Sequence, residues 1–230
     1  MGTKKIKGVL FDFNGTLFFD TDCHVKAFEQ YYAKCGMEVP SAEYIINNLF
    51  GLSNEAIYKT FFDPNATPED CRRFGEEKER LYYQACLNLP NGMQYTKGAC
   101  EFLSYLKENN IPYCLATGAG MDNITFYNEN MDLWKWFDRD HIVCADDPVN
   151  CKPDPAIYRY AASKIGLDAS ECIVFEDGPL GLIAASKANV SAAVVICQEG
   201  LPSPLINGIT ADAAYKDFTE WKEIVKKFGI

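Results

Sequence analysis

Short, continuously apolar runs recur along the chain and are its clearest structural signal. Each has the length of a strand and shows no alternation of apolar and polar residues; they are residues 6–12, 112–117, 142–145, 172–176 and 192–197. Runs of this kind are typical of strands that are covered on both faces. The pattern therefore predicts a largely buried sheet whose strands come from distant parts of the sequence.

Amphipathic stretches lie between the later runs. In residues 97–109, the apolar residues Ala99, Phe102, Leu103 and Leu106 recur at helical spacing. Residues 155–165 and 180–188 have a similar pattern. Strands that alternate with helices predict an α/β fold with a doubly wound parallel sheet.

About 95 residues separate the first two predicted strands, far more than one crossover requires. Three segments within them have helical patterns with charged faces: 22–36, 41–62 and 67–87. We therefore expect a small α-helical cap domain at residues 19–95 and a catalytic core made of residues 1–18 and 96–230. Because crevices in such sheets open at the carboxyl ends of strands, an insertion directly after the first strand would act as a lid.

The charge balance restricts the class of partner. The 230 residues include 22 basic and 32 acidic side chains, which give a net charge of −10. This argues against nucleic acid and against an anionic membrane surface, since both favour basic patches. A small anionic substrate remains compatible, because a few local cations can override the overall field.

The apolar runs and the cysteines indicate the compartment. No apolar run reaches about 18 residues, and no charged-then-apolar leader opens the chain, so we expect neither a membrane span nor a signal peptide. The ten cysteines include no CxxC pair, and several lie within apolar runs. Free, buried thiols are typical of a cytoplasmic protein, and we expect a cytoplasmic monomer.

Polar side chains stand where the predicted strands end. They are Asp12 after the first strand, Thr117 and Gly118 after the second, Lys152 in a later loop, and Glu176 and Asp177 after the fourth. The carboxyl ends of parallel strands meet at one edge, so these groups should converge. Clustered carboxylates repel each other unless a hard cation neutralises them, and oxygen ligands favour Mg²⁺. Asp12 could then attack phosphorus, while Lys152 and Thr117 hold the phosphate oxygens.

Four motifs that carry these residues occur in a fixed order: DFNGTL, LATG, CKPDP and FEDGPLGLIAA. Together they resemble the four motifs of the haloacid dehalogenase-like hydrolase superfamily. The resemblance is closest to the subgroup with a helical cap that contains β-phosphoglucomutase and small sugar-phosphate phosphatases, and it covers essentially the whole chain.

The resemblance implies roles for individual residues. Asp12 matches the nucleophile, and Thr117, with Gly118 beside it, and Lys152 match the phosphate-holding residues. The backbone carbonyl of Asn14 and the carboxylate of Asp177 match Mg²⁺ ligands, with Glu176 in support. On the cap side, His24 and Lys78 match substrate-binding residues, although Lys78 lies in a charged stretch, GEEKERL, that is typical of a solvated helix face.

Two departures from the family pattern affect the expected chemistry. The family's second aspartate, which protonates the departing oxygen and then activates water, is Asn14 here, and an amide cannot transfer a proton at neutral pH. The cap stretch LFGLSNEA has Phe50 and Asn54 where a mutase carries basic residues. A phosphatase is therefore favoured over a phosphoglucomutase.

The sequence thus predicts a Mg²⁺-dependent phosphatase that acts on a small phosphorylated metabolite through an aspartyl-phosphate on Asp12. Water activation would fall to His24, to the substrate or to solvent. Three alternatives stay open: a β-phosphoglucomutase-like phosphotransferase, a phosphonatase-like hydrolase, and a phosphate-ester binder with weakened turnover. The acidic pair Glu176 and Asp177 disfavours a metal-independent dehalogenase. The sequence does not distinguish a natural Asn14 from one that replaces an aspartate.

Overall fold

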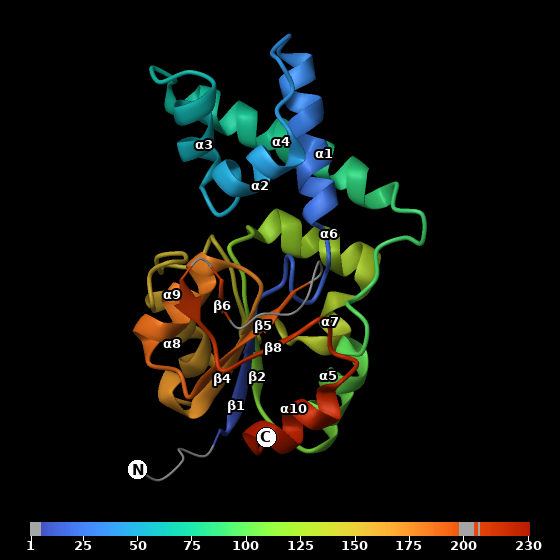
Figure 1. The fold of residues 1–230 in the computed structure, drawn as a ribbon, viewed down its shortest axis with the longest axis vertical. Helices are drawn as coiled ribbons and strands as arrows, with labels where there is room; N and C mark the ends of the chain where they lie inside the picture. Colours follow the sequence, from blue (N-terminus) through green and yellow to red (C-terminus); the bar gives the residue numbers. More distant parts are fainter. Residues whose placement is uncertain (1–5, 198–204, 207) are drawn as a thin grey trace. The chain divides into compact units, whose positions relative to one another are not determined.

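The computed structural model describes residues 6–197, 205–206 and 208–230. The chain divides into two compact units. Figure 1 shows the fold with colours that follow the sequence. The core unit consists of the described residues of Met1–Phe19 and Gln94–Ile230, and the helical unit is Asp20–Met93.

The core unit contains a six-stranded sheet with the strand order β3-β2-β1-β4-β5-β8. Its strands are β1 (Gly8–Phe11), β2 (Tyr113–Ala116), β3 (Ile142–Val143), β4 (Cys172–Glu176), β5 (Ala192–Ile196) and β8 (Ala213–Tyr215). All neighbouring strands are parallel, which confirms the predicted doubly wound parallel sheet. The first strand, β1, is central and pairs with β2 and β4, which follow it at distant positions in the chain (Figure 1).

One face of the sheet packs on small and aliphatic side chains. Leu10 of β1 and Val174 of β4 belong to the same buried cluster as Ile157 and Ala184. These last two residues lie on α8 (Ala156–Lys164) and α9 (Pro179–Ala188).

The other face of the sheet packs on aromatic rings. The next residue of β1, Phe11, stacks on Phe175 at a centroid distance of 5.3 Å and contacts Phe102 at 5.9 Å and Phe218 at 6.0 Å. Phe102 lies on α5 (Ala99–Glu108). Because successive strand residues point to opposite faces, Leu10 and Phe11 bury both sides of β1, which explains its continuously apolar sequence.

The sequence pattern left several elements of the core unit unpredicted. These are α6 (Met121–Met131), α7 (Leu133–Trp136), α10 (Trp221–Phe228), the edge strand β8, and the antiparallel pair β6 (Leu205–Ile206) and β7 (Ile209–Thr210). Short 3₁₀ segments also occur at Arg139–His141 and Ala169–Glu171. These strands have at most three residues, and α6 is rich in polar residues, so neither carries a strong periodic signal.

The helical unit contains α1 (Thr21–Lys34), α2 (Ala42–Leu49), α3 (Asn54–Phe61) and α4 (Pro68–Leu87). The sequence pattern predicted one helical stretch over 41–62, but the structure places two helices there. Gly51 has a φ of 80°, which ends the first helix, and the Ser53 side chain accepts a hydrogen bond from the Ala56 backbone N–H at 3.2 Å, which begins the second. Such a side-chain cap satisfies an otherwise unpaired donor.

The structure also bears on membrane-spanning helices and on the state of the cysteines. In the part of the chain that the structure describes, no helix combines the length and apolar character that a membrane crossing requires. The ten cysteines are free thiols, of which Cys35 and Cys151 are exposed.

Candidate active site

Asp12 lies one residue beyond the central strand β1. Its backbone N–H donates to the Phe175 carbonyl at 3.0 Å, which fixes the start of the following loop against β4. Its side chain is only 8% exposed and is bonded to the ammonium of Lys152. Burial raises the pKa of Asp12 to about 7; Lys152 opposes this rise, and Glu176 adds to it. The strand order reverses between β1 and β4, where crevices of open α/β sheets form.

Lys152 joins the two buried carboxylates of the site. Besides Asp12, its Nζ contacts Oε1 of Glu176 at 2.6 Å. Burial lowers the pKa of Lys152, but the charges of Asp12 and Glu176 outweigh burial, so its pKa is raised overall. Lys152 therefore holds its proton firmly and provides a fixed positive charge.

Glu176, the last residue of β4, is 2% exposed and held from several directions. The Tyr158 hydroxyl donates to its Oε1 at 2.5 Å, and the backbone N–H groups of Asp177 and Gly178 donate to Oε2 at 3.1 and 3.3 Å. Gly181 makes room for this carboxylate, because a Cβ at that position would overlap it. Glu176 thus positions Lys152 and the turn that carries Asp177.

The donor atoms of the site suit a hard cation. Asp12, Glu176 and Asp177 each offer one carboxylate oxygen, and these oxygens lie within 4.8 Å of one another. Oxygen-only donors are those that Mg²⁺ prefers, and three carboxylates exceed the one positive charge of Lys152. Gly15 permits the close approach of the loop: its φ is 77°, and a Cβ there would overlap the Asp177 carboxylate. The residues present therefore fit Mg²⁺.

Asn14 follows Asp12 by two residues, and Thr117 follows the last residue of β2. The Thr117 hydroxyl donates to Oδ1 of Asn14 at 3.4 Å and accepts from the Ala119 backbone N–H at 3.1 Å. Nδ2 of Asn14 donates to the hydroxyl of Tyr127, on α6, at 2.7 Å. Gly118, next to Thr117, has open space where a side chain would project. A phosphate could approach the backbone closely there.

The structure thus clusters four predicted residues of the core unit, Asp12, Lys152, Glu176 and Asp177, and it joins two more, Asn14 and Thr117, by a hydrogen bond. Sequence reasoning missed Tyr127 and Tyr158. Tyr158 follows the CKPDP motif on a helix and could have been suspected from its place after Lys152. Tyr127 carries no local signal, since α6 was not predicted.

His24 and Lys78 belong to the helical unit. His24 stacks on Tyr82 with a centroid distance of 4.1 Å and an interplanar angle of 12°, and its Nε2 lies 3.3 Å from Oδ2 of Asp20. The ammonium of Lys78 lies 5.6 Å from the centroid of the Tyr82 ring and 2.8 Å from Glu79. Lys78 is only 7% exposed, so the solvated face that its charged stretch suggested is wrong. The assignment of both residues to substrate binding stays a prediction.

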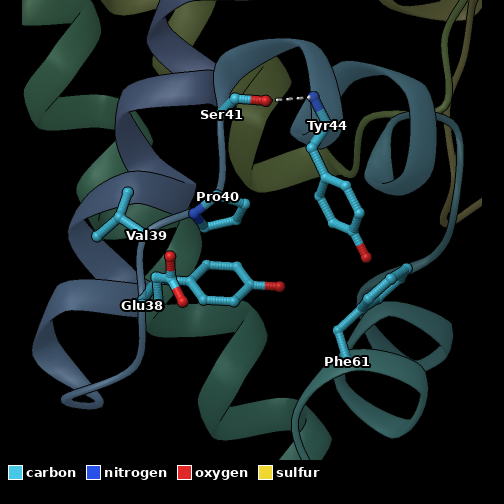
Figure 2. A pocket seen from close by; sticks show the side chains of 7 residues that line it. Glu38, Val39, Pro40, Ser41, Tyr44 and Phe61 are labelled. Carbon is cyan, nitrogen blue, oxygen red and sulfur yellow. Dashed lines mark hydrogen bonds between the residues drawn. The ribbon is translucent and has the colours of Figure 1, made fainter.

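A separate cavity of about 390 Å³ lies within the helical unit. Figure 2 shows its lining, in which Tyr44 points toward Phe61 and the Ser41 hydroxyl caps α2 by accepting from the Tyr44 backbone N–H. Val39 and Pro40 add apolar surface, and Glu38 adds a carboxylate. The lining includes none of the predicted site residues, so this cavity is distinct from the carboxylate cluster.

The parallel sheet and the buried carboxylate–lysine cluster at the ends of its central strands define an α/β fold with an acidic centre. The model of the haloacid dehalogenase-like hydrolase family matches residues 9–195, and the chain belongs to this family. The resemblance predicted from the four motifs is confirmed.

Known relatives agree with this membership. A Drosophila melanogaster protein named "Probable pseudouridine-5'-phosphatase" is 28% identical over 198 residues, covering 84% of this chain and 82% of that protein. A crystal structure of a HAD hydrolase of family IA, variant 3, from Entamoeba histolytica is 31% identical, covers 98% of this chain and 100% of its own, and has a TM-score of 0.85. A β-phosphoglucomutase structure from Clostridium difficile, 21% identical with 97% of each chain covered and a TM-score of 0.78, shares the fold.

Proposed function

We propose that the protein is a Mg²⁺-dependent phosphatase that acts on a small phosphorylated metabolite through an aspartyl-phosphate on Asp12. The observation that carries this proposal is the cluster itself: Asp12 is buried, bonded to Lys152, and within 4.8 Å of carboxylate oxygens of Glu176 and Asp177. Burying a carboxylate has a cost that packing alone would not require, which supports a catalytic role for Asp12.

Residues of the core unit would have different roles in the reaction. Asp12, Asp177 and the backbone carbonyl of Asn14 would hold Mg²⁺, with Glu176 in support; when bound, the ion offsets the negative charge of carboxylates and phosphate. An Asp12 oxygen attacks phosphorus, and the bond to the departing oxygen breaks. Lys152, with the Thr117 hydroxyl, stabilises the oxygens on which charge accumulates.

Two considerations support a small phosphorylated metabolite as the substrate. The Drosophila relative is named for a phosphorylated nucleoside, and the net charge of −10 disfavours nucleic acid and anionic membranes. We further propose that His24 and Lys78 take part in substrate binding. A cytoplasmic location and a monomeric state are part of the same proposal.

A second candidate function is phosphate-ester binding with little turnover. Asn14 favours it, because the amide that donates to Tyr127 and accepts from Thr117 cannot activate water. In this case Asp12 would still be phosphorylated, but release of phosphate would be slow.

Phosphoryl transfer to Asp12 can be tested directly. Purified protein is incubated with p-nitrophenyl phosphate and with acetyl phosphate, with Mg²⁺ or with EDTA, and p-nitrophenol, phosphate and the intact mass of the chain are followed. We expect a phosphorylated chain only with Mg²⁺, and none in Asp12→Asn. Asp140→Asn, which changes an exposed carboxylate, should match the wild type.

Two results would contradict the proposal. Labelling that persists in Asp12→Asn would exclude Asp12 as the nucleophile. Metal-independent release of halide from 2-chloropropionate would indicate dehalogenase chemistry instead.

A further inference from the structure

The side chain of Asn14 is fixed by two hydroxyl groups of the core unit. Its Nδ2 donates to Tyr127 at 2.7 Å, and its Oδ1 accepts from Thr117 at 3.4 Å. Tyr127 is fully buried and stacks on Phe13 with a centroid distance of 4.4 Å. The orientation of the amide is therefore set by a rigid part of the core, and one of its N–H groups is committed to a buried phenol.

The groups around Asp12 do not offer a proton readily. Asn14 has no ionisable proton at neutral pH. The ammonium of Lys152 is bonded to Asp12 and lies 2.6 Å from Oε1 of Glu176, so it is directed at two carboxylates of the site. Glu176 accepts from the Tyr158 hydroxyl, from Lys152 and from two backbone N–H groups, so its oxygens are already engaged as acceptors. Among these described residues of the core unit, the side chains are held in hydrogen bonds and ion pairs with one another.

We propose that the site acts on phosphate compounds whose departing oxygen is stable as an anion, namely acyl, enol or aryl phosphates. This proposal rests on the phosphatase function proposed above. An Asp12 oxygen forms a bond to phosphorus, the bond from phosphorus to the departing oxygen breaks, and that oxygen keeps the electron pair and leaves unprotonated. Water then attacks the aspartyl-phosphate, the electron pair returns to the Asp12 carboxylate, and the proton of the water goes to phosphate or solvent. Alkyl phosphates, whose alkoxide needs a proton, are poor substrates, and this class includes the 5'-phosphate for which the Drosophila relative is named, so the relative supports the small size of the substrate and not its leaving group.

The surroundings of Asn14 are polar and contain two hydroxyl groups. Hydroxyl groups such as those of Tyr127 and Thr117 can donate as well as accept, so the hydrogen-bonding types around position 14 are compatible with an aspartate. Proton transfer at position 14 is therefore prevented by the amide side chain itself and not by the residues around it. Asn14→Asp is accordingly a fair test, and Asn14→Ala is its matched control because it keeps the backbone carbonyl and removes the amide.

The test measures kcat/KM with Mg²⁺ for substituted phenyl phosphates, acetyl phosphate and glycerol 3-phosphate in the wild type, Asn14→Ala and Asn14→Asp. The ratio kcat/KM reports the first irreversible step, in which the departing oxygen leaves. We expect a steep fall with rising leaving-group pKa in the wild type and an equal slope in Asn14→Ala. In Asn14→Asp, the alkyl-to-aryl ratio should rise by about 10²-fold, since general acid catalysis is worth about 10²–10⁴-fold.

The readouts separate this inference from the proposed function. A flat dependence in the wild type, with Asp12 phosphorylated by alkyl and aryl phosphates alike, would overturn the inference alone, since some other group would then supply the proton. A phosphorylated chain detected by intact mass with acetyl phosphate, but not with glycerol 3-phosphate, supports it. Absence of both labelling and phosphate release with every compound would overturn the phosphatase proposal itself.

Discussion

Ionised Asp12 should destabilise the metal-free protein. Burial raises its pKa to about 7 from an ordinary value of 3.8. Between these two pH values the folded chain keeps a proton that the unfolded chain releases. The contribution of Asp12 to stability is therefore fully present below about pH 4 and is lost as pH rises through 7.

The size of the effect follows from the same two values. Their difference of about 3 corresponds to about 4 kcal/mol, at about 1.4 kcal/mol for each pKa unit. Since Asp12 is almost fully buried, solvent screening reduces this figure little. In a chain of this length, about 4 kcal/mol corresponds to a fall in Tm of about 10 °C.

The assay compares thermal unfolding of the wild type and Asp12→Asn in EDTA from pH 4.5 to 8.5. Other groups titrate in both proteins, so the difference between the two curves isolates Asp12. The amide oxygen at position 12 can still accept a hydrogen bond from Lys152. If this bond is weaker in the variant, the Tm of the variant shifts by the same amount at every pH, and the slope of Tm against pH does not change. Adding Mg²⁺ to the wild type should remove most of the fall, because a cation favours the ionised carboxylate.

Parallel curves for the wild type and Asp12→Asn across this pH range would refute the reasoning. The ionised carboxylate would then be fully compensated by Lys152, and burial would not dominate. Asp140→Asn serves as the control, because the exposed Asp140 should leave the slope unchanged.

Two further variants test the contacts that hold Glu176, and a third tests whether the stability of the helical unit affects phosphorylation of Asp12. Gly181→Ala would place a Cβ in the Glu176 carboxylate, so urea unfolding should show a loss of about 2 kcal/mol and phosphorylation of Asp12 should fall; unchanged stability would mean that Glu176 relocates freely. Tyr158→Phe removes the 2.5 Å donor to Glu176 and should cost about 1–3 kcal/mol by the same measurement, with a smaller loss counting against the importance of that bond. Thr67→Ala removes the capping box of α4 and should cost about 1 kcal/mol of stability while leaving Asp12 labelling unchanged. Altered labelling would show that the stability of the helical unit affects phosphorylation of Asp12.

The sequence was informative about the sheet because its strands are buried on both faces. The run around Leu10 and Phe11 is apolar throughout, since one residue packs on aliphatic helix residues and the next on aromatic rings. Parallel strands place their carboxyl ends on one edge, so the convergence of Asp12, Thr117 and Glu176 could be anticipated from strand ends alone. The length and the continuous apolar character of these runs were enough to predict the strands.

Non-local packing explains what the sequence did not predict. Lys78 stands in a charged stretch, yet it is buried, with its ammonium 5.7 Å from the ring of Phe28, which lies on α1. Tyr127 reaches Asn14 from a polar helix that lies 113 residues further along the chain. Neither contact leaves a local pattern, because the partner is chosen by the fold and not by neighbouring residues.

Position 14 can serve two roles that depend on different atoms. The backbone carbonyl proposed to hold Mg²⁺ is the same for any side chain, whereas transfer of a proton requires a carboxylate. Asp12, Lys152 and Asp177 therefore keep their proposed parts in capture of the phosphoryl group, while hydrolysis of the aspartyl-phosphate loses its general base. If capture is faster than hydrolysis, phosphorylated protein accumulates and turnover underestimates the competence of the site. The fraction of chains that carry a phosphoryl group, and not the rate of phosphate release, then decides whether Asp12 is a nucleophile.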